Sequence, residues 1–294
     1  MFLFSLAYKE KLRFLKFSLS LFRVLVDAII NHMTGGPRKG EGTGGSLFVG
    51  RYMNYTAVPY TEEDFHESCP IEDGKDVYET RNCKLVGLND LDQSREHVRE
   101  MIAGYLNDLI NIGVKGFRVD ASKHMWPEDL EAIWSRLSNT FDGHKPVFIH
   151  EVIDYGNSCE GCSVQNYYHL GKVTEFRYGD NVSKAVKRSK FFKLRKVYDE
   201  KRGMADSAHA AVFIDNHDNQ RHKMRLVTAS RLEDHDDRLY KMAVSFMLAH
   251  DYGFKRVMSS FYFNHENNTM RSPETPPQPY PGPCGNGWTC EHRF

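Results

Sequence analysis

Four runs of apolar residues in this sequence end in polar side chains that could do chemistry. They end at Asn31-His32, Asp120, Glu151 and Asn216-His217-Asp218. Carboxyl groups and imidazoles donate and accept protons, and carboxylates also act as nucleophiles. A single acid in such a position is more often a solvated loop residue. Four polar ends in the same place relative to an apolar run indicate a shared site.

These side chains require elements that hold them at one edge of a sheet. Apolar runs of strand length alternate with segments whose apolar residues recur at helical spacing. We predict strands at 23–30, 114–120, 146–153, 172–179, 209–218 and 255–263, and helices at 95–112, 127–138, 182–193 and 239–250. This alternation favours an α/β fold with parallel strands, and (β/α)8 barrels gather their active sites at the C-terminal strand ends. An open doubly wound sheet is the alternative, but no GxGxxG follows a predicted strand.

Residues 33–91 interrupt the alternation, because they are Gly-rich at 35–45 and show no helical period. We therefore predict an irregular excursion from the main fold. Lys+Arg and Asp+Glu both number 39 in the 294 residues, so no global basic field is available to hold nucleic acid. No stretch approaches the roughly 18 apolar residues of a membrane span.

The six cysteines fall in three local pairs, which suggests disulfides in an oxidising compartment. Free thiols are the alternative. Three glycosylation sequons, at Asn54, Asn181 and Asn267, point to the same compartment. The apolar residues 1–8 are followed rather than preceded by charge, so they form no clear signal peptide.

Four segments of this sequence closely resemble the signature segments of the α-amylase family of glycoside hydrolases and occur in the same order. They are Asp27-Ala-Ile-Ile-Asn31-His32, Gly116-Phe-Arg118-Val-Asp120-Ala-Ser-Lys123-His124, Glu151-Val-Ile-Asp154 and Phe213-Ile-Asp-Asn216-His217-Asp218. The resemblance is strongest to the animal-type, chloride-dependent enzymes and covers about residues 23–294. It implies endo-hydrolysis of α-1,4-glucosidic bonds in starch and glycogen with retention of configuration. The first two barrel strands and the family's C-terminal β-sandwich have no counterpart, so we expect an incomplete (β/α)8 TIM barrel.

The resemblance also implies a division of the chain. Residues 1–30 would hold an N-terminal segment and the third barrel strand, and 31–91 a calcium-clamped excursion domain. Residues 92–271 would form the rest of the barrel, and 272–294 a Pro-rich tail bracketed by cysteines. We expect a secreted monomer that binds an α-glucan and no nucleic acid, and that has no membrane span.

The resemblance assigns the catalytic carboxyl groups: Asp120 as the nucleophile, Glu151 as the general acid/base and Asp218 as the third carboxylate. Arg118 lies two residues before Asp120, so a strand puts both on one side and the cation keeps Asp120 ionised. Glu151 stands between apolar Ile149 and Val152, and partial desolvation favours the protonated form that a proton donor needs.

The resemblance further implies three sets of binding residues. Substrate would be bound by Asp27, His32, Lys123, His124 and His217. Calcium would be bound by the side chains of Asn31 and Asp90 and by backbone oxygens of Arg81 and His124. Chloride would be bound by Arg118, Asn216 and Arg256. The alternative interpretation of Arg256 is an ordinary solvated cation.

Disulfides Cys69–Cys83 and Cys284–Cys290 also follow from the resemblance. Cys159 and Cys162 match no family pair, and we expect a local disulfide there. Two local departures are the glycine-free stretch after Asp218 and Asp251 in place of a usual proline. An α-glucosidase or a catalytically inactive relative that acts as a binding domain are the alternatives to an α-amylase.

Overall fold

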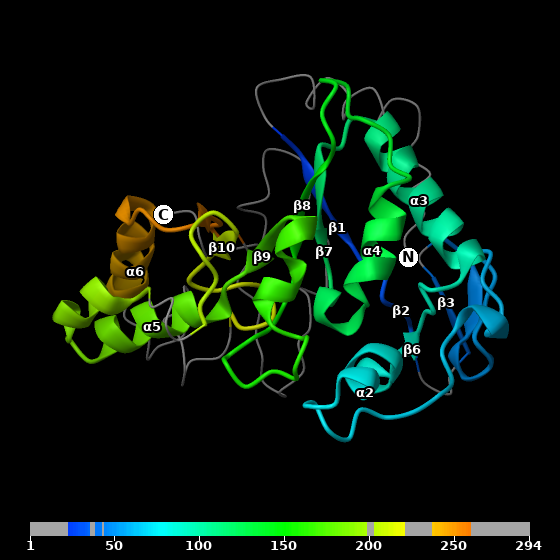
Figure 1. The fold of residues 1–294 in the computed structure, drawn as a ribbon, viewed down its shortest axis with the longest axis horizontal. Coiled ribbons are helices and arrows are strands. Elements are labelled where there is room, and N and C mark those ends of the chain that lie inside the picture. The colour runs from blue at the N-terminus through cyan, green and yellow to red at the C-terminus, as the bar shows by residue number, and fades with distance from the viewer. Residues whose placement is uncertain (1–22, 36–38, 43, 199–202, 221–236, 260–294) are drawn as a thin grey trace. The chain divides into compact units, whose positions relative to one another are not determined.

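The computed structural model of this chain describes residues 23–35, 39–42, 44–198, 203–220 and 237–259 (Figure 1). The chain divides into two compact units, 1–174 and 175–294. The domain boundaries expected near residues 31, 92 and 272 remain predictions.

A parallel sheet forms the centre of the first unit. Its strands are β1 (Leu25–Ala28), β7 (Gly116–Val119), β8 (Val147–His150) and β9 (Lys172–Thr174), paired in that order. The register places Asp27 beside Arg118 and Arg118 beside Ile149. All four strands lie within the predicted segments, and their C-terminal ends share one edge.

Helices α3 (Glu96–Asn111) and α4 (Pro127–Trp134) link these strands and pack on each other. Apolar residues of α3 recur every four positions and are buried: Val98, Ile102, Leu106 and Ile110. The helix ends at Asn111, and Gly113 just beyond it has a φ of 106°, a conformation that suits glycine. Trp134 of α4 stacks on Phe148 of β8, with ring centroids 4.2 Å apart. This core fixes β7 and β8 side by side.

The predicted excursion is built from short elements between β1 and α3. β2 (His32–Met33) pairs antiparallel with β6 (Asn89–Asp90), and β3 (Lys39–Glu41), β4 (Leu47–Val49) and β5 (Asn54–Tyr55) form a small antiparallel sheet. The 3-10 helices are η1 (Gly50–Tyr52), η2 (Glu62–Asp64) and η3 (Leu85–Gly87). The Cys69–Cys83 disulfide is confirmed.

The excursion also contains one short helix of about a turn and a half, α2 (Val77–Asn82). Six residues are too few for a helical period to show in the sequence. Asp76 caps this helix, because its carboxylate accepts the Glu79 amide at 2.9 Å.

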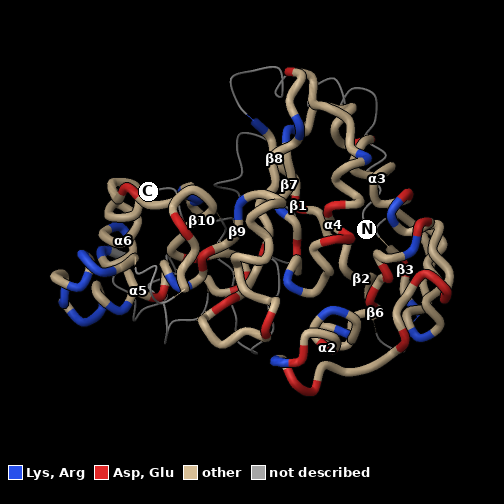
Figure 2. Tube along the Cα trace, in the orientation of Figure 1, with Lys and Arg blue, Asp and Glu red and all other residues tan. Residues whose placement is uncertain are grey.

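The second unit contains α5 (Phe176–Lys187), the 3-10 helix η6 (Phe191–Lys196), β10 (Ala210–Val212), α6 (Asp237–Ala249) and β11 (Phe254–Lys255). β10 and β11 are parallel, and α5 packs against α6. Figure 2 shows that Lys and Arg gather at α5.

Three predicted strands are much shorter than expected, and the one predicted at 209–218 is reduced to Ala210–Val212. The strand predicted at 172–179 ends at Thr174, because Glu175 starts α5 by accepting the Arg177 amide at 2.9 Å. Gly179 then faces Ile214, where a Cβ would lie 2.5 Å from the backbone oxygen. The strand predicted at 255–263 is reduced to Phe254–Lys255 with an irregular stretch up to 259, and its remainder lies outside the described residues.

Candidate active site

Arg118 gathers three carboxylates at the C-terminal ends of β1, β7 and β8. Its Nη1 donates to Asp27 at 2.8 and 3.1 Å and to Asp120 at 2.5 Å, and its Nη2 lies 2.5 Å from Glu151 Oε1. The Arg118 and Glu151 side chains are only 7% and 8% exposed. One buried cation therefore brings together both predicted catalytic carboxyl groups of this unit.

Backbone geometry fixes the second oxygen of Glu151. Its Oε2 accepts the Ala121 amide at 2.9 Å. Ala121 adopts φ 49°, a left-handed conformation that costs a non-glycine residue about 1–3 kcal/mol. This strained residue directly follows Asp120, so the turn that ends β7 orients both Asp120 and the amide that holds Glu151.

Two predicted substrate-binding histidines, His32 and His124, are half-buried, and their surroundings lower the pKa of both. His124 Nδ1 donates to the Thr80 carbonyl at 2.8 Å, and burial lowers the pKa of His124 to about 4. Burial also lowers the pKa of His32, opposed by the nearby charge of Asp120. Neutral imidazoles in these positions suit hydrogen bonds to uncharged hydroxyl groups.

Lys123 fastens the loop that follows Glu151. Its Nζ donates to the Ile153 carbonyl at 3.0 Å and to Ser158 Oγ at 3.1 Å. Burial lowers the pKa of Lys123, and the charge of Asp154 opposes this shift. The ammonium group thus connects the turn after β7 to the loop after β8.

The side chains predicted to bind calcium meet in the first unit. Asn31 Nδ2 donates to Asp90 Oδ1 at 3.2 Å, while the fully buried Asn31 Oδ1 has no hydrogen-bond partner. Burial raises the pKa of Asp90 to about 6, despite its contact with His66. An orphaned amide oxygen beside a buried carboxylate fits a hard cation.

The backbone oxygens of Arg81 and His124, which are predicted to complete this set, come from α2 and from the turn after β7. The His124–Thr80 hydrogen bond links η4 (Ser122–His124) to α2, which carries Arg81 next to Thr80. No cluster of three His, Cys, Asp or Glu side chains suited to a metal is found among the residues that the structure describes. The proposed set contains only one such side chain, since an amide and carbonyls supply the other oxygens.

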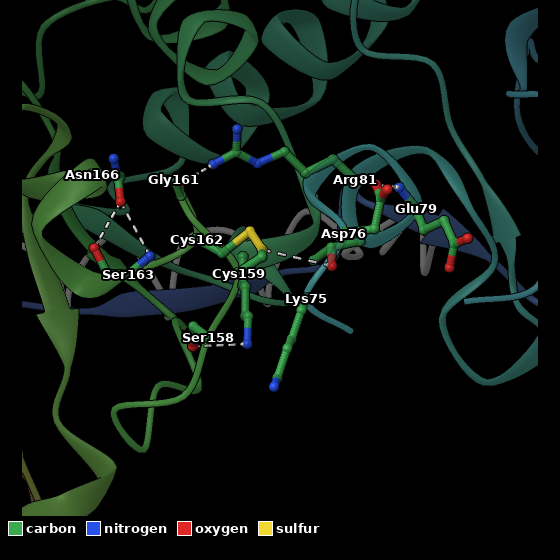
Figure 3. Close-up of a disulfide and its surroundings, with 12 residues drawn as sticks. Lys75, Asp76, Glu79, Arg81, Ser158, Cys159, Gly161, Cys162, Ser163 and Asn166 are labelled. Atoms are coloured by element: carbon green, nitrogen blue, oxygen red, sulfur yellow. Dashed lines mark hydrogen bonds between the residues drawn. A yellow bond between two sulfur atoms is a disulfide. The ribbon is translucent and has the colours of Figure 1, made fainter. Parts of the chain in front are cut away.

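The expected local disulfide Cys159–Cys162 is confirmed (Figure 3). Both cysteines are buried, and the loop between them is tied to α2, because Arg81 Nη2 donates to the Gly161 carbonyl at 2.6 Å. The Arg81 guanidinium also lies 4.6 Å from the Trp126 ring centroid. The disulfide loop thus supports the helix whose backbone would contact calcium.

The remaining predicted site residues belong to the second unit. Asp218 lies 3.3 Å from His217 Nε2 and 3.5 Å from Asn216 Nδ2, and its side chain is 45% exposed. The backbone N–H of Arg256 donates to the carbonyl of Val212, the last residue of β10. The roles of these four residues beside Asp120 and Glu151 stay predictions. The predicted Cys284–Cys290 disulfide lies outside the described residues.

The sequence reasoning missed two contacts of Arg118, those with Asp27 and Glu151. Spacing along one strand placed Arg118 beside Asp120, but contacts across strands depend on register. The missing information was the parallel register that aligns Asp27 with Arg118. In the sequence, only the polar residues at the ends of neighbouring strands pointed to these contacts.

Among the described residues, no helix is long and apolar enough to cross a membrane.

Comparison with known proteins identifies relatives of this chain. An α-amylase of Tribolium castaneum is 43% identical over 285 residues, covering 92% of this chain and 56% of the relative. Pancreatic α-amylase 2a5 of Mus musculus is 41% identical over 300 residues, covering 92% and 58%. The chain thus spans little more than half the length of these curated relatives. No family model matches it.

A solved structure agrees with the sequence comparisons. A mutant of α-amylase I from Eisenia fetida in complex with maltohexaose matches with a TM-score of 0.78 and 37% identity, over 92% of this chain and 59% of that one. The match confirms the predicted α/β fold as part of an amylase TIM barrel. The ordered signature segments, the paired strand ends and these relatives lead to one conclusion: this chain belongs to the animal α-amylase family.

Proposed function

We propose that this protein hydrolyses internal α-1,4-glucosidic bonds of starch and glycogen with retention of configuration. The observation that carries the proposal is the pair Asp120 and Glu151, held by one buried guanidinium at neighbouring strand ends. Retention requires two carboxyl groups only about 5–5.5 Å apart, and a shared cation keeps such a pair close. Maltohexaose bound to the Eisenia relative supports the choice of an α-glucan.

Each carboxyl group has a separate step. Asp120, oriented by its hydrogen bond from Arg118, attacks the anomeric carbon and forms a covalent glycosyl-enzyme. Glu151 gives its proton to the departing glycosidic oxygen and then takes one from the attacking water. We retain Asp218 of the second unit as the third carboxylate, which holds the distorted sugar.

The residues proposed to bind substrate come from the same signature segments. His32, His124 and Lys123 provide hydrogen bonds to sugar hydroxyls, and His217 is retained in that role as a prediction. Asp27 was predicted to bind substrate, but its carboxylate is engaged by Arg118. We therefore propose that Asp27 positions the guanidinium.

Calcium would be held by Asn31 and Asp90 side chains and by the backbone oxygens of Arg81 and His124. The buried, unpartnered Asn31 Oδ1 and the buried Asp90 carboxylate support this set. Bound calcium would supply positive charge and rigidity rather than chemistry. It would join the β2–β6 ladder, α2 and the turn after β7, which bears Asp120.

Chloride would act through Arg118, with Asn216 and Arg256 as the further predicted ligands. Glu151 cannot donate a proton from an oxygen that is ion-paired with Arg118. An anion that occupies the guanidinium would compete for this contact and favour protonated Glu151 by like-charge repulsion. Replacing chloride by an inert anion should lower the rate and shift the pH optimum downward, and an unchanged profile would reject the chloride assignment.

Two disulfides in the described part of the chain support an extracellular location, as cytosolic thiols are kept reduced.

The substrate proposal is tested by the products formed from maltoheptaose. An endo-acting enzyme releases a mixture of short oligosaccharides. Release of glucose alone from one chain end would indicate an α-glucosidase, and binding without turnover would indicate a non-catalytic relative.

A further inference from the structure

Lys and Arg gather at α5 of the second unit (Figure 2), and the 3-10 helix η6 that follows it adds further cations and two exposed phenylalanines. Residues 184–196 read KAVKRSKFFKLRK and contain no acid. We call the exposed members of this segment the basic–aromatic patch: Lys184, Lys187, Arg188, Lys190, Phe191, Phe192, Lys193, Arg195 and Lys196. The proposed hydrolysis of glucans uses none of them.

The patch stands on a fixed base. The opposite face of α5 buries Val182, Ala185 and Val186. The Lys190 amide donates to the Ala185 carbonyl at 2.9 Å, and Asn181 Nδ2 donates to the carbonyl of buried Val197 at 3.0 Å. Both ends of the 3-10 helix η6 are therefore tied to α5, and its outward side chains keep a defined arrangement.

Helix stability explains only part of this charge. Cations in the last turn of α5, such as Lys184 and Lys187, complement the helix dipole. The later cations lie beyond that turn. Within the described residues, no ion pair is formed by Arg188, Lys190, Lys193, Arg195 or Lys196. Their charge is available to an anionic partner.

The phenyl rings distinguish between anionic partners. Phe191 and Phe192 are 44% and 70% exposed, and Leu194 is half-buried. In a 3-10 helix residues three apart align, so Phe191 lies above Leu194 and Lys193 above Lys196. An apolar row thus runs beside a cationic row. A polyanion in water needs only the cations, whereas a lipid interface also accepts the rings.

We propose that the basic–aromatic patch binds the surface of membranes that carry anionic phospholipids. Lys and Arg side chains contact the headgroups, and Phe191 and Phe192 insert at the boundary with the acyl chains. Such attachment would be peripheral and would hold the protein at a surface without a membrane-spanning helix. The proposal stands independently of the hydrolytic function.

Co-sedimentation of the full chain with vesicles tests the proposal. The chain should bind phosphatidylcholine vesicles that contain phosphatidylserine and not vesicles of phosphatidylcholine alone, and added salt should weaken binding. Lys193→Gln/Lys196→Gln should weaken binding by at least about tenfold. Phe191→Ser/Phe192→Ser should do so by about tenfold as well, because the buried ring area is lost.

Matched controls separate this surface from general charge and hydrophobicity. Lys39→Gln/Lys75→Gln removes two exposed cations elsewhere, and Phe141→Ser removes a ring that is 58% exposed. Both should bind vesicles like the unmutated chain, and all variants should keep its melting temperature. Equal binding to both vesicle types would overturn the proposal. Unchanged vesicle binding by the phenylalanine variant would also overturn it. The cations alone would then account for binding, as they would for a soluble polyanion such as heparin.

Discussion

At the scale of single residues, Arg118 is the centre of the candidate site. Its guanidinium contacts Asp27, Asp120 and Glu151, and it is itself nearly buried. Burial of a cation is unfavourable unless acids compensate it, and the three carboxylates raise the pKa of Arg118 further above its ordinary value. The same residue therefore couples the orientation of the nucleophile to that of the proton donor.

The first prediction concerns Glu151. Glu151→Gln keeps the shape of the side chain but removes its ability to carry a transferable proton, so hydrolysis of soluble starch should fall at least about 100-fold. Oligosaccharide binding by calorimetry should persist. Glu131→Gln on the exposed face of α4 is the control and should retain full activity. Activity of Glu151→Gln within tenfold of the unmutated chain would remove Glu151 from the catalytic role.

The second prediction separates two roles for Asp27. As a residue that positions Arg118, Asp27→Asn should lower kcat about tenfold with little change in KM, because ground-state binding is untouched. A direct substrate ligand would instead raise KM at constant kcat. Steady-state kinetics on maltoheptaose distinguish the two, with Asp108→Asn on the exposed face of α3 as the control.

At the scale of secondary-structure elements, length decided what the sequence could predict. The 16 residues of α3 show their four-residue spacing clearly, whereas the six of α2 cannot. The strand predicted at 172–179 ends early, because the Glu175 side chain caps the N-terminus of α5. The apolar residues after Glu175 belong to the helix and not to the strand. The Arg118–Glu151 pair was not predictable, since it depends on the register between β7 and β8.

The third prediction concerns the link between α2, the β2–β6 ladder and the turn after β7. If calcium joins them, a chelator should lower the melting temperature by several degrees, because a ligand at 100 times its Kd stabilises by about 2.7 kcal/mol. Asp90→Asn should melt at the chelated temperature with or without added calcium. Asp108→Asn should respond like the unmutated chain. A melting curve that excess chelator leaves unchanged would contradict the site.

The fourth prediction concerns His150 at the end of β8. Its fully buried ring lies among Phe148, Trp134 and Tyr167, and burial lowers its pKa to about 3. The unfolded chain therefore binds one more proton than the folded chain between about pH 6.5 and pH 3. The free energy of unfolding should drop by about 1.4 kcal/mol per pH unit as the pH falls through this window.

His150→Phe keeps an aromatic ring and should remove this contribution, so that its unfolding free energy depends less on pH below 6.5. His144→Phe, at an exposed position, should leave the pH dependence unchanged. Urea titrations at several pH values give both slopes. Identical slopes for His150→Phe and the unmutated chain would show that His150 titrates normally.

At the scale of the whole molecule, the chain spans 56% and 58% of the lengths of two α-amylase relatives. Asp120 and Glu151 belong to its first unit and Asp218 to its second. The sequence predicted the fold class and which residues lie at strand ends, because long signature segments keep their order. It could not predict how one arginine serves three acids, since that depends on packing.

The most direct test of the central claim is the anomeric configuration of the first product. Proton NMR during hydrolysis of maltoheptaose resolves the two anomers before they equilibrate. Double displacement through Asp120 predicts short oligosaccharides whose new reducing ends are initially α, and no such signal with Glu151→Gln. New reducing ends that are initially β would contradict a retaining mechanism, and no turnover by the unmutated chain would contradict hydrolysis itself.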